Sequence, residues 1–108
     1  MGADVRRVMS IGTQNAPGLL IDYADGRRAT MNCYGDGPFN FQMKYADGHI
    51  ASIPDCSDYF ANFIVDLVDF FRTGDVKVSH AETIAIMGIL EKGRLALDDP
   101  EHWYNLND

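Results

Sequence analysis

The stretch from 57 to 97 constrains the fold most, because it holds two helical patterns joined by a short turn. In the first pattern, apolar residues recur at the i, i+3, i+4, i+7 spacing of one wide helical stripe. The stripe comprises Tyr59, Phe60, Phe63, Ile64, Leu67, Val68, Phe70 and Phe71. Gly74 follows this pattern and is well placed for the left-handed residue that ends a helix. The pattern therefore predicts an amphipathic helix that ends at this glycine.

The second pattern begins with a helix-capping signature. Ser79 and Glu82 have the spacing of a capping box, in which each side chain bonds an orphan backbone donor of the first turn. Apolar residues continue to Leu97, and Asp98 and Asp99 follow. Acidic side chains oppose the dipole at the end of a helix, so we expect the second helix to stop near Leu97.

The residues before 57 predict strands, and the apolar face of these strands must be buried against the two helices. Alternation is weak across 3–14 and clearer at 19–23, 28–34 and 49–53. The cleanest period-two pattern lies at 39–45, where Phe39, Phe41, Met43 and Tyr45 alternate with polar residues. Strands followed by helices predict an α+β fold, with an antiparallel sheet of about four or five strands and two helices on one face. A final extended segment around 103–106 is expected to pack on the rim.

The two faces of the predicted sheet differ in character. Met31 and Cys33 are expected in the core beneath the helices, Cys33 as a small apolar residue. The opposite face is polar, and such a face is either solvated or docked against another protein. If it is an interface, it should contain Thr30, Asn32, Asn40, Gln42 and Lys44.

Length and composition exclude several classes of protein. The 108 residues are expected to form one domain, 1–108, which needs no disulfide for stability. Cys33 and Cys56 lack CxxC spacing, so we expect free thiols and a cytoplasmic location. The net charge of −7 argues against nucleic-acid binding. The sequence contains neither a signal-peptide pattern nor an apolar run that could span a membrane.

No active site is predicted from the residues themselves. The Gly35-Asp36-Gly37 loop lacks the third glycine and the following helix of a dinucleotide fingerprint. The histidines and cysteines lack metal-ligand spacing, and no nucleophile signature surrounds Cys56 or Ser57. The carboxylates Asp66 and Asp69 are expected on a solvated helix face. We therefore assign no catalytic, cofactor-binding or metal-binding residue, and a hydrolase hypothesis would rest only on unpaired Cys56 and His80.

The helix pair also carries a family resemblance. Residues 59–75, which end in Arg-Thr-Gly-Asp, and residues 78–87, which contain Ser-His-Ala-Glu-Thr, resemble the C-terminal end of the Gfo/Idh/MocA oxidoreductases. That family closes with a Phe- and Leu-rich helix ending in Arg-Thr-Gly, followed by a Pro-Val-Ser-x-Glu-Glu-Thr-like helix start. Lys77 stands where the family often has Pro, and Ala81 where it often has Glu. Residues 12–34 also resemble strands of that family's C-terminal sheet.

The resemblance implies a parent enzyme with an N-terminal Rossmann domain for NAD or NADP. Its C-terminal domain would have an open sheet that shapes the substrate site and mediates homo-oligomerisation. This chain lacks the Rossmann fingerprint, the Glu-Lys-Pro motif and the downstream Asp and His motif, so no functional residue is carried over. The resemblance thus implies a substrate-side and oligomerisation domain of an oxidoreductase acting on a sugar, polyol or related hydroxyl compound, inactive on its own. The alternative is an autonomous dimerising or ligand-binding α+β module.

Overall fold

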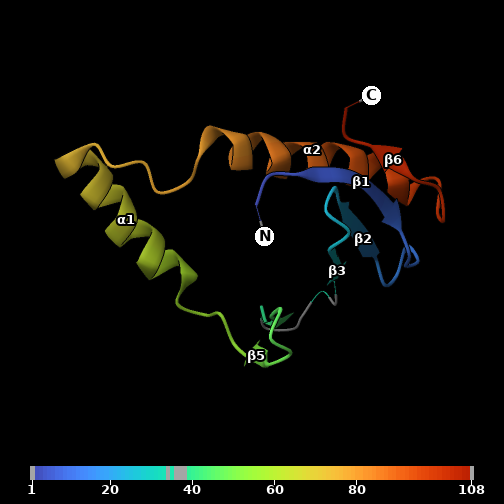
Figure 1. The fold of residues 1–108 in the computed structure, drawn as a ribbon, viewed down its shortest axis with the longest axis horizontal. Coiled ribbons are helices and arrows are strands. Elements are labelled where there is room, and N and C mark those ends of the chain that lie inside the picture. The colour runs from blue at the N-terminus through green and yellow to red at the C-terminus, as the bar shows by residue number, and fades with distance from the viewer. Residues whose placement is uncertain (1, 34, 36–38, 108) are drawn as a thin grey trace. The chain divides into compact units, whose positions relative to one another are not determined.

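The computed structural model describes residues 2–33, 35 and 39–107 (Figure 1). The chain divides into two compact units, 1–34 together with 78–108, and 35–77. Among the described residues are a four-stranded antiparallel sheet, a two-stranded sheet and two helices that follow the first five strands. The predicted α+β class is therefore confirmed. Tyr34 and residues 36–38, which include part of the glycine loop considered above, lie outside the described residues.

The first unit is built on the four-stranded sheet. Its strands are β1 (Val5–Ser10), β2 (Gly18–Tyr23), β3 (Arg28–Asn32) and β6 (Tyr104–Asn105), in the order β3-β2-β1-β6. The two residues of β6 pair antiparallel with Arg7 and Val8 of β1. The terminal segment expected to pack on the rim thus completes the edge of the sheet through backbone hydrogen bonds.

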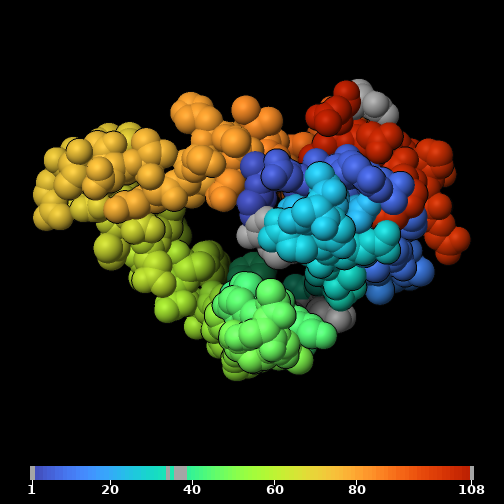
Figure 2. All heavy atoms as spheres, in the orientation of Figure 1, coloured from blue at the N-terminus to red at the C-terminus, as the bar shows by residue number. Residues whose placement is uncertain are grey.

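One helix, α2 (His80–Leu97), covers one face of this sheet. Small residues on α2 permit close approach: a Cβ added to Gly93 would lie 3.1 Å from Leu19 Cδ2. The buried core consists of Val5, Val8, Leu19, Ile21, Tyr23, Ala85 and Ala96. In Figure 2 the atoms of the N-terminal strands and of the C-terminal part of the chain pack together. Burial of this apolar surface is the main force that holds the unit together.

Met31 and Cys33 are not part of the core, although the sequence predicts them there. Met31 is 45% exposed and Cys33 is also exposed. The predicted face is right, because Met31 pairs with Leu19, whose side chain lies beneath α2. The prediction of burial is wrong, because α2 packs mainly on β1 and β6. These strands lie toward the opposite edge of the sheet from β3, so α2 leaves the face of β3 exposed.

The second unit holds β4 (Phe41–Lys44), β5 (Ile50–Ile53) and α1 (Tyr59–Thr73). The two strands pair antiparallel around the 46–48 turn, where Gly48 has the positive φ of +94° that this turn needs. These strands form their own sheet instead of extending the four-stranded one. All residues of α1 are described and none of them is buried, so the second unit by itself does not cover the apolar stripe predicted for this helix.

The predicted helix ends are confirmed. Gly74 has φ +79° and its N–H bonds the Phe70 carbonyl, which ends α1. Ser79 Oγ accepts a hydrogen bond from the Glu82 N–H at 3.1 Å, and α2 ends at Leu97. Within the described part of the chain, neither helix is long and apolar enough to cross a membrane.

Candidate functional site

A carboxylate on the face of the sheet opposite α2 is the centre of the candidate site. Leu19, Ile21 and Tyr23 of β2 belong to the core, so the intervening Asp22 points to the other side of the sheet. Despite this position, Asp22 is only 4% exposed. A buried carboxylate is unfavourable unless charged or polar partners replace its lost water. The surroundings of Asp22 must therefore supply such partners.

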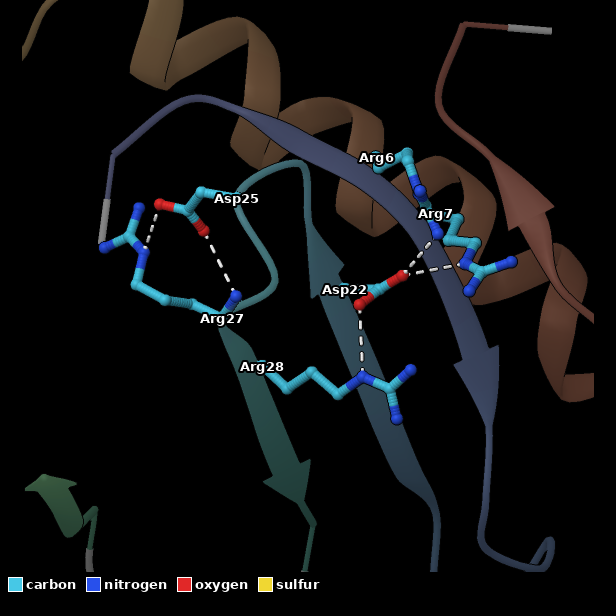
Figure 3. Close-up of polar contacts among 6 residues, drawn as sticks. All are labelled: Arg6, Arg7, Asp22, Asp25, Arg27 and Arg28. Carbon is cyan, nitrogen blue, oxygen red and sulfur yellow. Dashed lines mark hydrogen bonds and ion pairs between the residues drawn. The ribbon is translucent and has the colours of Figure 1, made fainter.

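Three arginines surround this carboxylate (Figure 3). Asp22 Oδ2 accepts hydrogen bonds from Arg7 Nε at 2.8 Å and from a terminal nitrogen of Arg6 at 3.0 Å. Asp22 Oδ1 accepts one from Arg28 Nε at 3.1 Å. Arg7 and Arg28 are the direct cross-strand neighbours of Asp22 on β1 and β3. The three residues thus form one row across the sheet, with the acid between two bases.

A β-bulge explains why the adjacent residues Arg6 and Arg7 reach the same carboxylate. Side chains of consecutive strand residues normally point to opposite faces. Here Val5 pairs with Tyr23 while Arg7 pairs with Asp22, so Arg6 is an extra residue on β1. A bulge of this kind locally redirects side chains. The irregularity in β1 therefore brings a third guanidinium to the carboxylate.

Trp103 lies beside two of the guanidinium groups. The Arg7 Cζ is 4.0 Å from the centroid of the Trp103 ring, and the Arg28 Cζ is 5.8 Å from it. Both distances lie within the range of a cation–π interaction. Trp103 directly precedes β6, whose pairing with β1 brings the indole to Arg7. Together, Arg6, Arg7, Asp22, Arg28 and Trp103 form what we call the arginine cluster.

The arginine cluster carries net positive charge in a chain that is negatively charged overall. The hydrogen bond from Arg7 lowers the pKa of Asp22 below its ordinary value of 3.8, and Arg28 acts in the same direction, while burial opposes both. Asp22 is therefore ionised at neutral pH. Three guanidinium charges against one carboxylate leave two formal positive charges in a chain whose net charge is −7.

An apolar groove lies on the other, α2-covered side of the same unit. It has a volume of about 220 Å³ and exposes almost no polar surface. Its lining comes from β2, β3 and α2 and includes Leu19, Met31, Cys33, Leu90, Gly93 and Arg94. The groove occupies the space that α2 leaves uncovered beside β3. It is open to solvent, and Arg94 is the charged residue in its wall.

The five residues of the predicted interface are all exposed, but they do not share one sheet. Thr30 and Asn32 lie on the edge strand β3, whereas Gln42 and Lys44 lie on β4 and Asn40 shortly precedes it. Thr30 and Asn32 therefore belong to a different sheet from Gln42 and Lys44, and Asn40 lies just before the second sheet begins. Their role in association stays a prediction.

Histidines, cysteines and acids do not gather into a site in the described structure. No group of three such residues in residues 2–33, 35 and 39–107 could hold a metal ion. Cys33 is exposed, Cys56 is half-buried, and His80 lies exposed in the first turn of α2. Asp69 pairs with Arg72 at 3.1 Å and with Lys77 at 2.6 Å, which accounts for it as a structural ion pair.

Sequence reasoning missed the arginine cluster. One available signal was Asp22 itself, a charged residue within the otherwise apolar Leu-Leu-Ile-Asp-Tyr strand. Comparisons with protein-family models, curated proteins and solved structures found no match to this chain.

Proposed function

We propose that this chain is the C-terminal substrate-side and oligomerisation domain of an NAD(P)-dependent oxidoreductase similar to the Gfo/Idh/MocA enzymes. The parent enzyme would act on a sugar, polyol or related hydroxyl compound, and the chain alone would be inactive. The resemblance depends on the Arg-Thr-Gly turn and the Ser-x-x-Glu-Thr helix start. Both segments have the local geometry that such motifs need, a left-handed helix end at Gly74 and a side-chain cap at Ser79.

The observation that carries the proposal is the apolar stripe of α1, which its own unit leaves exposed. This helix has 15 residues, and none of them is buried. Phe60 is 65% exposed and Phe71 is 79% exposed. Contiguous exposed apolar surface in a water-soluble protein marks a contact with a partner. A helix of this kind is expected in a domain that works within a larger assembly.

The proposed assembly can be tested by adding charge to the predicted interface. The double variant Asn40→Glu/Gln42→Glu adds two negative charges per chain, which a symmetric contact would bring close to their copies. We expect weaker self-association in sedimentation velocity over a concentration series. A matched control, Gln14→Glu/Asn15→Glu, makes the same chemical changes in the exposed β1–β2 turn and should leave association unchanged. Equal sedimentation of the wild type and both variants would contradict the proposed interface.

The groove beside α2 favours a second candidate function, an autonomous ligand-binding module. A largely apolar concavity with few polar groups is typical of small-molecule sites. Leu90 lines this groove and is 57% exposed, so Leu90→Arg should place a charge in it without disturbing the core. Ile84, 71% exposed on the same helix, provides the control variant Ile84→Arg. If the groove binds ligands, an apolar fluorescent probe should lose affinity for Leu90→Arg alone, and equal affinities would eliminate this candidate.

A further inference from the structure

We propose that the arginine cluster binds a phosphate group, as inorganic phosphate or as a small phosphate monoester. The proposed hydrogen-bond donors are the guanidinium groups of Arg7 and Arg28, held by Asp22 and flanked by Trp103, and Arg6 adds a third positive charge beside the same carboxylate. All these residues belong to the first unit. The inference is independent of the proposed oxidoreductase assignment, since it needs neither a nucleotide nor a second domain.

The hydrogen-bonding pattern leaves donors available to a ligand. A guanidinium has five N–H donors, and Arg7 and Arg28 each direct only the Nε donor to Asp22. Within the part of the chain that the structure describes, the terminal nitrogens of these two arginines donate no hydrogen bond. Figure 3 shows these terminal nitrogens pointing away from the carboxylate. Two sets of terminal N–H groups are therefore free to bind an oxyanion.

The charge of the cluster matches a doubly charged ligand. Asp22 neutralises one of the three surrounding guanidinium groups, which leaves two positive charges. A phosphate monoester carries a charge between about −1.5 and −2 at neutral pH. Arginine is also well suited to phosphate, because its planar fork can bond two oxygens at once. A monocarboxylate would neutralise only one of the two remaining charges.

The donors are also held in place before a ligand arrives. Asp22 has a side chain that is 5% exposed, so it holds the guanidinium groups from beneath and presents little negative charge to solvent. Arg7 is further restrained by the Trp103 ring at 4.0 Å, and its side chain is only 27% exposed. Such preorganisation reduces the entropy that binding must overcome. Arg28, at 55% exposure, is the more accessible of the two.

Trp103 provides a direct readout, because it is the only tryptophan in the chain. Its emission should change when phosphate binds to the guanidinium over its ring. We would titrate the full chain with inorganic phosphate at constant ionic strength, at a concentration where it is monomeric. The expected result is a saturable change that neither chloride nor acetate reproduces. An emission change that follows ionic strength alone, or an equal response to acetate, would overturn the proposal.

Two variants test the assignment to named residues. Arg28→Gln should weaken phosphate binding about tenfold or more, as expected for the loss of one charge-assisted hydrogen bond. Arg72→Gln, which removes an exposed arginine from the second unit, should have no effect. Unchanged phosphate binding by Arg28→Gln, or an equal loss of binding in Arg72→Gln, contradicts the site.

A simple alkyl phosphate monoester distinguishes the two sources of the phosphate group. Tighter binding of the monoester than of inorganic phosphate would support a phosphorylated small molecule as the ligand. Equal binding would support phosphate itself. Binding of neither would refute the proposal, whereas a failure of self-association would bear only on the proposed oligomerisation.

Discussion

The contact between α2 and the sheet leads to a prediction about Gly93. This glycine lies inside α2, where alanine is favoured over glycine by about 1 kcal/mol. The added Cβ would lie 3.1 Å from Leu19 Cδ2 and 3.5 Å from Leu19 Cδ1. Leu19 must therefore shift by a few tenths of an ångström. Both residues line the open groove, which gives the leucine room to move.

We therefore expect Gly93→Ala to stabilise the first unit by about 0.5–1 kcal/mol. The assay is urea unfolding followed by Trp103 fluorescence, which reports on this unit. Gly88→Ala is the matched control: its added Cβ would lie 3.1 Å from Leu106 Cδ2, with the same gain in helix propensity. The reasoning would be refuted if Gly93→Ala destabilised the unit by more than about 1 kcal/mol while Gly88→Ala stabilised it. That result would mean that Leu19 is too tightly packed to move away from the added methyl group.

Two further predictions concern the helix cap and the buried acid. Ser79→Ala removes the acceptor for the Glu82 N–H and should cost about 1 kcal/mol in thermal unfolding, and an unchanged Tm would contradict the cap. Because the Arg7 hydrogen bond lowers the pKa of Asp22, the ionised carboxylate stabilises the fold at neutral pH. This contribution should begin to fall near the ordinary value of 3.8 and disappear as pH drops through the lowered pKa. In thermal melts from about pH 6 to about pH 2, the Tm of Asp22→Asn should fall less steeply with acid than the Tm of the wild type. Parallel curves of Tm against pH for the two proteins would contradict this role of Asp22.

Local patterns predicted the secondary structure well. The strand alternation, the Gly74 turn and the Ser79 cap each depend on residues close together in sequence, and each is present. The sequence pattern places the terminal segment at the rim of the sheet, but its pairing with β1 joins residues almost a hundred positions apart, such as Arg7 and Asn105. Likewise, the sequence does not show that β4 and β5 pair with each other and not with the strands of the four-stranded sheet. Alternation identifies a strand and does not identify its partner.

The arginine cluster could not be predicted from periodicity. Regular alternation would place Arg6 and Arg7 on opposite faces of β1, and only the bulge brings both to Asp22. A bulge depends on the register with β2, which the sequence of β1 does not contain. Similarly, the exposure of Met31 follows from where α2 crosses the sheet. Both features depend on tertiary arrangement, which local sequence patterns do not encode.

The most direct test of the central claim is sedimentation velocity of the full chain across a concentration series, with NAD and NADP binding followed by calorimetry in the same preparation. The account predicts concentration-dependent dimers or larger oligomers and no nucleotide binding by the chain alone. A strict monomer that binds nucleotide would contradict the proposed substrate-side and oligomerisation domain.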